Sequence, residues 1–489
     1  MLFNSIDFAL FFPTVFLLYW LVAKQLKLRN LFLLISSYVF YGWWDWRFLF
    51  LIVISSLVDY YVGNKLAKTE GNNARKRLLF ISLAVNLGML FYFKYTNFFI
   101  ETFVDSFRLF GKTLEISSLN IILPVGISFY TFQTLSYTID IYRKKLQPTR
   151  DPIAFFAFVA FFPQLVAGPI ERASHLLPQF FERHKFNYEQ VKSGLLLMAF
   201  GLFKKMVIAD RAALYVNEVY NNPSSYEGIE TMIATFLFAF QIYCDFSGYS
   251  DIAIGTARTM GFSLMKNFDS PYLSNSITEF WRRWHISLST WFRDYVYIPL
   301  GGSKKGKVKT YSNLFIVFLV SGLWHGAAMT FVIWGAIHGA IIVFEKAISE
   351  SKAKLFKFLR INPQVFSNKL FFVFTTFVFV CFAWVFFRAN SFADAKMIVE
   401  GFFVNNFYKV FGDPLYVIGL KENEFTFLIL SIIALVLFER FHRRNSVFHL
   451  LKQQAFLFRW IVYVAIVLLI TIFGVYGDAS VTEFIYFQF

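Results

Sequence analysis

Apolar runs of membrane-spanning length recur along this chain from its first residues to its last. A transmembrane helix needs about 20 mostly apolar residues, and the runs here are about 14 to 25 residues long. Only 16% of the 489 residues are charged, against about 25% in a soluble domain. The sequence therefore predicts an all-α polytopic membrane protein. It excludes a soluble enzyme, a secreted disulfide scaffold and a disordered tail protein.

The runs predict twelve transmembrane helices in one domain. A cleaved signal peptide opens with a positive segment, but no Lys or Arg precedes Lys24, so we expect a retained first span that starts outside. No internal repeat is evident, and we expect a single membrane domain over 1–489, with a core near 120–390 between N-terminal helices 1–119 and C-terminal helices 391–489. The spans are expected near residues 5–22, 30–44, 46–64, 78–93, 120–141, 190–218, 229–256, 311–324, 326–345, 370–388, 425–439 and 460–476.

The basic residues give the chain a net charge of +16, and they gather in short loops between the apolar runs. In membrane proteins the short cytoplasmic loops carry most of the Lys and Arg. With the amino terminus outside, 35 of the 47 Lys and Arg residues fall in predicted cytoplasmic loops and 8 fall outside. The positive charge therefore sets the orientation of the spans, and it does not indicate a nucleic-acid partner.

The apolar stretch 153–168 is expected to enter the membrane without crossing it, because counting it as a span would place the basic segment 258–310 outside. Pro163 and the pair Gly168-Pro169 support a re-entrant segment, since they break helices. Broken helices occur at membrane depth only where protein or a water-filled cavity satisfies the freed backbone. The sequence thus implies a cavity.

The stretch 276–299 is the most informative polar segment. Ser276 and Glu279 have the spacing of a capping box, and Pro299 stops the predicted helix. One interpretation is an amphipathic helix on the cytoplasmic surface, anchored by snorkelling arginines. The other places His285 at the mouth of a cavity, with the arginines and the loop 301–305 facing an anionic cytoplasmic molecule. One face would carry Trp281, Trp284, His285, Leu288, Trp291, Phe292 and Tyr295, and the other Arg282, Arg283, Ser289, Thr290, Arg293 and Asp294.

His325 lies in the motif Ser321-Gly322-Leu323-Trp324-His325-Gly326, at the end of a run of about fourteen residues that is too short to cross a bilayer. An ionisable residue within the membrane is a functional-site candidate, and histidine suits proton transfer near neutral pH. The alternative is a histidine that only packs between helices. His338 is expected to pack. The histidines of the predicted cytoplasmic loops are expected to be solvated, namely His175, His184, His442 and His449.

A third polar stretch runs from Gln241 to Asp251 inside the predicted span 229–256. Gln241, Asp245 and Gly248 fall on one stripe of that helix, and a carboxylate there must be paired or face water. Pairing with the span 190–218 is the favoured interpretation, and a polar substrate channel is the alternative. The candidate partners are Lys204, Lys205 and Asp210.

Several kinds of chemistry are excluded by the motifs. The two cysteines, Cys244 and Cys381, lie in apolar runs and form neither a disulfide framework nor a CxxC metal site, and we expect no metal. No GxSxG, HExxH or P-loop sequence occurs. The residues by themselves leave an enzyme and a transporter open, although transporters usually contain internal repeats and paired broken helices.

The polar motifs together resemble those of membrane-bound O-acyltransferases, in the branch that acetylates bacterial exopolysaccharides such as alginate. The resemblance covers essentially the whole chain, and the pair formed by Trp281-Arg282-Arg283-Trp284-His285 and Leu323-Trp324-His325-Gly326 is highly specific. The carboxyl-terminal motifs resemble the polysaccharide-acetylating branch rather than the shorter D-alanyl transfer proteins of teichoic acid. The matching stretches are 162–170, 203–211, 241–251, 280–289, 291–302, 322–326, 386–389 and 484–489.

This resemblance implies a ring of helices around a thinned central funnel, in the inner membrane of a bacterium. His325 takes the position of the family's essential histidine and His285 that of its second one. The resemblance also implies acetyl-CoA as a donor substrate from the cytoplasm, with no permanently bound cofactor, and an extracytoplasmic polysaccharide as the final acceptor. A separate serine-hydrolase-like partner is expected to finish the transfer. Alginate, peptidoglycan, cellulose and other polysaccharides remain open as acceptors.

Transfer from a thioester to a hydroxyl needs a base for the hydroxyl proton and donors for the developing oxyanion. We therefore expect His325 to act as general base and His285 as an orienting or second acid–base group. Transient acetylation of His325 is a second mechanism, and an export scaffold or transporter for an acylated glycan is the alternative function. Residues expected to bind donor or substrate, or to contact lipid headgroups, are Arg282, Arg283, Lys304, Trp284, Trp324, Asp245 and Gln241.

Overall fold

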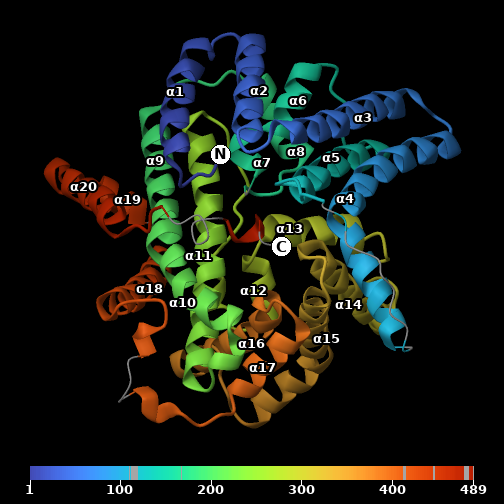
Figure 1. Cartoon of the computed structure of the whole chain (residues 1–489). Coiled ribbons are helices and arrows are strands. Elements are labelled where there is room, and N and C mark those ends of the chain that lie inside the picture. The colour runs from blue at the N-terminus through green and yellow to red at the C-terminus, as the bar shows by residue number, and fades with distance from the viewer. Residues whose placement is uncertain are drawn as a thin grey trace. The chain divides into compact units, whose positions relative to one another are not determined.

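The computed structural model describes residues 1–109, 111, 119, 121–166, 168–410, 415–443, 447–477 and 484–487. Within these ranges the chain forms helices and no strand (Figure 1). Some residues of the predicted features lie outside the described ranges. They are Lys112, Asn120 of the fifth span, Ala167 of the re-entrant stretch, Arg444 of the basic segment 440–459, and Gln488 and Phe489 of the last motif.

Every predicted span coincides with a helical segment, and seven helices among the described residues are long and apolar enough to cross a membrane. The chain is therefore a multi-pass membrane protein, and the count of twelve spans stays a prediction. The described chain forms two compact units, one of residues 1–198 and 250–265 and one of residues 199–249 and 266–489. The expectation of a single membrane domain also stays a prediction.

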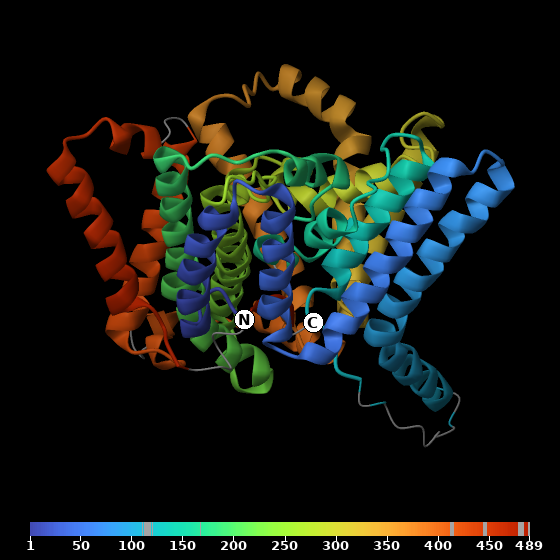
Figure 2. The same ribbon diagram turned by 90° about the horizontal axis from the view of Figure 1, so that it is seen from above.

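The first unit contains most of the N-terminal helices. The helices α3 (Leu49–Lys68), α4 (Asn72–Leu109) and α5 (Ile127–Tyr142) lie side by side (Figure 2) and share a cluster of polar side chains. The carboxylate of Asp59 accepts hydrogen bonds from Ser82, from Asn86 at 2.9 Å and from Thr138 at 2.9 Å. Such bonds tie neighbouring membrane helices together. The helices are α1 (Ile6–Val22), α2 (Leu26–Gly42), η1 (Trp46–Phe48), α3 (Leu49–Lys68), α4 (Asn72–Leu109), α5 (Ile127–Tyr142), α6 (Pro152–Ala160), α7 (Phe162–Leu165), α8 (Ala173–Leu176), η2 (Leu177–Phe181), most of α9 (Tyr188–Leu202) and the end of α11 (Ile229–Thr259).

The predicted re-entrant stretch forms two short helices, α6 and α7, which break at Phe161. Their freed backbone groups find partners in neighbouring helices. The Phe162 N–H donates to the Ser37 hydroxyl at 3.0 Å, and the Gln133 side chain donates to the Phe158 carbonyl at 2.9 Å. Neither helix is long enough to cross a bilayer, which agrees with a segment that enters without crossing.

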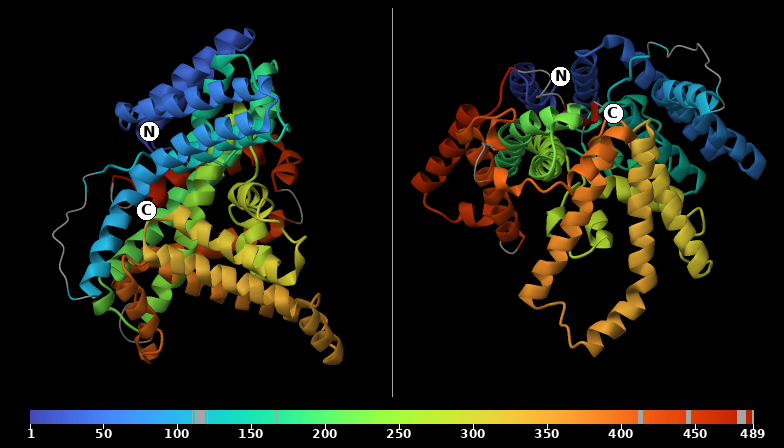
Figure 3. Two further views of the ribbon diagram at one scale, coloured as in Figure 1. Left: turned by 90° about the vertical axis from the view of Figure 1, so that its right-hand side faces the viewer. Right: turned by 60° about the horizontal axis from the view of Figure 1, so that its bottom comes forward.

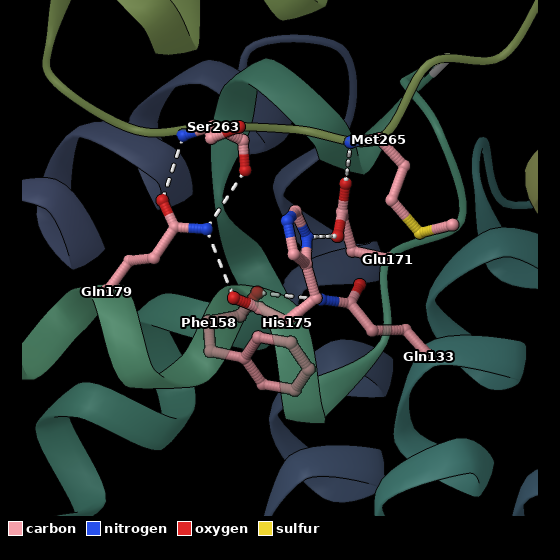
Figure 4. A network of polar contacts seen from close by, with 7 residues as sticks. All are labelled: Gln133, Phe158, Glu171, His175, Gln179, Ser263 and Met265. Carbon is pink, nitrogen blue, oxygen red and sulfur yellow. Dashed lines mark hydrogen bonds and ion pairs between the residues drawn. The ribbon is translucent and has the colours of Figure 1, made fainter.

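A polar clamp fastens the chain that leaves α11 (Figure 4). The buried carboxylate of Glu171 accepts from the Met265 N–H and pairs with His175 Nδ1 at 2.7 Å. The Gln179 amide accepts from the Ser263 N–H at 2.8 Å and donates to the Ser263 carbonyl at 2.9 Å. The clamp fixes residues 263–265, which lead along the chain to the segment 266–299.

This clamp predicts a pH dependence of stability. Pairing with Glu171 raises the pKa of His175 above its usual 6.5. The stability that this pair gives to the folded protein is therefore complete below pH 6.5, and it is lost as pH rises through the raised pKa. Replacing His175 with glutamine is therefore expected to lower the thermal unfolding midpoint more at about pH 5.5 than at about pH 8. His449→Gln, on the outer helix α19 (Val447–Lys452), is the control and is expected to show no such difference. An equal effect of His175→Gln at both pH values would contradict the assignment.

His184 differs from the solvated residue that the sequence predicts. Its ring packs edge-on against Phe262 with centroids 4.4 Å apart, and Nδ1 lies 2.9 Å from the Tyr19 hydroxyl. Burial lowers its pKa to about 4. His184 is a packed neutral residue, because a hydrophilic loop still folds back onto its own unit.

The second unit holds the remaining helices. Figure 3 shows α15 and α16 as two long neighbouring helices joined by residues 359–365. The elements are η3 (Phe203–Ala209), α10 (Asp210–Asn221), η4 (Pro223–Ser225), the start of α11, η5 (Pro271–Leu273), α12 (Ile277–Arg283), α13 (Ile286–Phe292), η6 (Arg293–Tyr297), α14 (Gly306–His325), α15 (Met329–Phe358), α16 (Phe366–Arg388), α17 (Phe392–Gly401), η7 (Phe407–Val410), η8 (Leu415–Val417), α18 (Glu422–His442), α19, α20 (Phe456–Phe473) and η9 (Ile485–Phe487).

Candidate functional site

His325 is the last residue of α14, and its side chain is buried, with 2% exposed. The helix is 20 residues long, so the expected short run of about fourteen residues is wrong as a helix length. The helix begins at Gly306, before the apolar run that starts at residue 311. The lysines and threonine of 306–310 are polar, so hydropathy did not include them, but they are compatible with a helix. His325 still lies at the far end of α14 from those charged residues.

Glycine lets α14 and α15 pack closely just before His325. A Cβ on Gly322 would overlap the Phe331 carbonyl and lie 3.3 Å from Gly335 Cα. A Cβ on Gly326 would overlap the Phe331 ring. The two glycines beside His325 thus fix the distance between the helices that carry the site.

Gly322→Ala is expected to destabilise the protein by about 1–3 kcal/mol, because the added methyl forces α14 away from α15. It is also expected to lower acyl transfer, since His325 follows one turn later. Thermal unfolding and activity of the purified variant check this. Gly88→Ala is a matched control in α4, where an added Cβ meets nothing within 4 Å. A Gly322→Ala protein as stable as the control would contradict the argument.

The predicted continuous helix over 276–299 is wrong, because the chain breaks at His285. The residue adopts a left-handed conformation with φ of 44°, between α12 and α13. Backbone hydrogen bonds to the segment 267–269 hold the chain on both sides of the break. The Ile286 N–H donates to the backbone carbonyl of Asn267 at 2.9 Å, and the Asp269 N–H donates to the backbone carbonyl of Arg283 at 3.0 Å.

The start of α12 follows the expected cap in part. The Ser276 hydroxyl accepts from the Glu279 N–H at 3.0 Å, while Glu279 itself accepts from the Asn275 N–H at 2.8 Å. Glu345 of α15 adds a second cap, accepting from the N–H groups of Ile277 at 2.8 Å and Thr278 at 3.0 Å. These bonds attach the start of α12 to α15.

The break turns the His285 ring toward Asn267. Nδ1 lies 3.1 Å from the side-chain amide oxygen of Asn267, which also accepts from the Ser287 hydroxyl at 2.9 Å. A carbonyl oxygen cannot donate, so Nδ1 carries the hydrogen and Nε2 is the basic nitrogen. Burial lowers the pKa of His285 to about 3, which makes it a neutral imidazole at physiological pH.

The two histidines lie together in an aromatic shell. The His285 and His325 ring centroids are 6.5 Å apart. Trp324 lies 6.2 Å from His285 and 4.9 Å from His325. The rest of the shell around His325 is formed by Trp334 at 5.0 Å, Phe387 at 5.4 Å and Tyr486 at 5.7 Å.

Four residues of this site were not singled out from the sequence: Asn267, Trp334, Phe387 and Tyr486. Phe387 and Tyr486 belong to the carboxyl-terminal motifs 386–389 and 484–489, which served only to distinguish branches of the family. A phenol between aromatic residues near the chain end was the available signal, but nothing in the sequence connects residue 486 with residue 325. Their contact depends on how the chain end is held.

A buried ion cluster holds the chain end. Lys205 Nζ lies 2.7 Å from Asp210 and 2.8 Å from Asp245, and all three side chains are almost fully buried. The other carboxylate oxygen of Asp245 accepts from the Ile485 N–H at 2.7 Å. Asp245 is thus paired with Lys205, as the favoured interpretation of the sequence predicted. The second carboxylate oxygen of Asp245 positions Ile485, the residue before Tyr486.

A cavity of about 780 Å³ lies between α12, α13, α14 and α15, and neither histidine is among its lining residues. Its apolar lining includes Trp281 and Phe318. On α14 the lining reaches Ser321, one turn and about 6 Å from His325 along the helix. Four cations line the cavity, namely Arg282, Arg293, Lys346 and Lys352, together with the acid Glu345 that caps α12.

The other candidate site residues lie in varied settings. Arg283 pairs with Glu279, and Trp284 is buried against Trp384 with centroids 5.1 Å apart. Gln241 is buried on α11 one turn before Asp245. Lys304 lies next to the cavity residue Ser303. Lys204 donates to Ser247 at 2.9 Å and His338 accepts from Trp281 at 3.2 Å, so both pack.

Comparison with known proteins places these features in a family. A family model for the membrane-bound O-acyltransferase family matches residues 47–384. The chain is 43% identical to the probable alginate O-acetylase of Pseudomonas putida over 80% of this chain and 78% of that protein. It is 37% identical to the peptidoglycan O-acetyltransferase of Helicobacter pylori over 82% and 79%, and 28% identical to the teichoic acid D-alanyltransferase of Bacillus subtilis over 56% and 70%. Because the family model covers most of the chain, this protein belongs to the membrane-bound O-acyltransferase family.

Proposed function

We propose that this protein is the membrane acetyltransferase of a polysaccharide O-acetylation system in a bacterial inner membrane. It would take an acetyl group from cytosolic acetyl-CoA and pass it to an acceptor hydroxyl for O-acetylation of an extracytoplasmic polysaccharide. The relatives named as O-acetylases of alginate and peptidoglycan support this acceptor class. Membership of an acyltransferase family favours an enzyme over the alternative of a transporter.

The observation that carries the proposal is a cavity that is lined by basic residues and reaches Ser321, one helical turn before His325. Lys346 and Lys352 lie in the second half of α15, within the basic segment 346–369 that is predicted to be cytoplasmic. Four cations suit the phosphates of a coenzyme A thioester. Glu345 in the lining and Asp294, which pairs with Arg293 at 2.8 Å, supply two negative charges against these four positive ones, so an excess of positive charge remains.

In the reaction, the acceptor oxygen would bond to the thioester carbonyl carbon while the carbon–sulfur bond breaks. His325 would accept the hydroxyl proton and return it to the leaving thiolate. His285, fixed by Asn267, would orient the acceptor or relay the proton through Nε2. A separate extracytoplasmic protein would then deliver the acetyl group to sugar hydroxyls.

Trp334 offers a donor for the oxyanion. Its indole N–H is buried, lies in the shell around His325 and has no acceptor among the described residues. Buried donors without a partner are rare. Trp334→Phe keeps most of the ring and is expected to lower kcat about 10- to 100-fold with little change in KM. Trp460→Phe, on the exposed face of α20, is the control. An unchanged kcat would remove Trp334 from the mechanism.

The donor is tested by comparing acetyl-CoA with acetyl-pantetheine, which lacks the nucleotide and its phosphates. Purified protein would be assayed for thiol release and for transfer to a small hydroxyl acceptor, with the extracytoplasmic partner added if none occurs. The variant Arg282→Gln/Arg293→Gln/Lys352→Gln is expected to raise KM about tenfold or more for acetyl-CoA and to leave KM for acetyl-pantetheine unchanged. Equal effects on both donors, or no release from acetyl-CoA with the partner present, would refute the proposal.

A further inference from the structure

A second cavity of the same unit is separate from the histidine site. It has a volume of about 650 Å³ and lies in a groove between α11, α16 and α18. Its lining residues recur every three or four positions on each helix, for example Phe236 and Phe240 on α11 and Leu370 and Phe374 on α16. Each helix therefore turns one continuous face into the α11–α16–α18 groove.

The groove is apolar along most of its length. From Phe366 to Phe377 the lining of α16 extends about 16 Å along the helix, which is about half of the hydrocarbon thickness of a bilayer. Leu370 and Phe374 on this wall are more than half exposed, at 54% and 62%. Such a surface within a membrane contacts lipid.

One end of the groove is strongly basic. Lys369 near the start of α16 lines the groove with Arg440 and Arg443 at the end of α18. The Arg440 guanidinium lies 5.5 Å from the centre of the Phe366 ring, which holds it at the groove. Glu439 is the acid of the lining, and it accepts a hydrogen bond from Tyr243.

We propose that the α11–α16–α18 groove binds one anionic phospholipid of the cytoplasmic leaflet. Its phosphate lies at Lys369, Arg440 and Arg443, and its acyl chains lie along the phenylalanines of α11 and α16. The orientation follows from the loop charge, because segments 346–369 and 440–459 are basic and are predicted to be cytoplasmic. A basic pocket between membrane helices on that side fits an anionic headgroup.

The lipid would also support the histidine site through the groove wall. Tyr243 lines the groove, bonds to Glu439 and packs against Trp284 with ring centroids 6.0 Å apart. Trp284 directly precedes His285. A lipid in the groove would therefore contact Tyr243, which packs against the residue next to the backbone break.

The test measures lipids bound to the intact, delipidated protein by native mass spectrometry, with phosphatidylglycerol and phosphatidylcholine of identical chains. The wild type is expected to prefer phosphatidylglycerol by about tenfold or more, and Lys369→Gln/Arg440→Gln/Arg443→Gln to lower this preference to about one. The charge-matched control Lys68→Gln/Lys76→Gln/Arg77→Gln removes three exposed cations of the predicted cytoplasmic side and is expected to keep it. Val373→Trp fills the groove and is expected to reduce retention of both lipids.

Three outcomes would overturn the proposal. One is equal retention of the two lipids by the wild type, and another is an unchanged preference in the triple glutamine variant. The third is displacement of phosphatidylglycerol by soluble glycerol phosphate at equal concentration, which would indicate a site for free phosphate rather than for lipid. Thermal unfolding of each variant separates loss of lipid from loss of fold.

Discussion

His325→Ala is expected to lower acetyl transfer by about 100- to 10,000-fold, the usual contribution of a general acid–base group. The imidazole is buried at the end of α14, within 6.5 Å of the His285 ring and one turn from the cavity residue Ser321. The tryptophan, phenylalanine and tyrosine rings packed around it are not bases at neutral pH, so none of them can replace it as the acceptor of the hydroxyl proton. The measurement is release of coenzyme A and of labelled acetyl product by purified protein.

Two comparisons make this result specific to the imidazole. His325→Gln keeps much of the side-chain volume without a base, and is expected to be as inactive as the alanine variant while unfolding near the wild-type temperature. His449→Ala, on α19, is expected to be fully active. Activity within about threefold of wild type in a folded His325→Gln protein would exclude His325 as the general base.

Lys205→Met is expected to destabilise the protein by about 3–5 kcal/mol, because it leaves two buried carboxylates without their cation. Lys205 bridges Asp210 at 2.7 Å and Asp245 at 2.8 Å, and the three side chains are 1–3% exposed. The variant is also expected to lose activity, since Asp245 positions Ile485 and hence Tyr486 beside His325. Thermal unfolding in detergent and the acetyl transfer assay measure the two effects.

Neutralising the whole cluster separates charge from packing. Lys205→Met/Asp210→Asn/Asp245→Asn buries no uncompensated charge, and the side-chain amide introduced at position 245 can still accept from the Ile485 N–H, so most of the lost stability should return. Lys396→Met removes an exposed ion pair with Glu400, and such pairs contribute about 0–1 kcal/mol. If Lys205→Met were no more destabilising than Lys396→Met, the cluster would not hold the chain end.

Much of this architecture follows from local sequence. Hydropathy located the helices because a membrane selects apolar runs of fixed length, and the basic loops predict their orientation. The pairing of Asp245 with the span 190–218 was expected because an unpaired carboxylate is costly in a membrane. Each of these inferences depends on residues within one or two helices.

Other features were beyond local sequence. Periodicity predicted one helix over 276–299, but His285 breaks it with a left-handed backbone that Asn267 and its neighbours stabilise. That break depends on hydrogen bonds to another segment, which outweigh the modest preference of each residue for helix.

The sequence by itself determined that this chain is a multi-pass helical membrane protein with His285 and His325 as its distinctive polar residues. Only the tertiary structure decided what surrounds them. Tyr486 reaches His325 because a charge cluster more than 200 residues earlier in the chain binds the backbone of Ile485. Whether a segment forms a helix depends mainly on residues that are neighbours in sequence. The contact between Tyr486 and His325 depends instead on how distant segments pack, so only the folded chain specifies it.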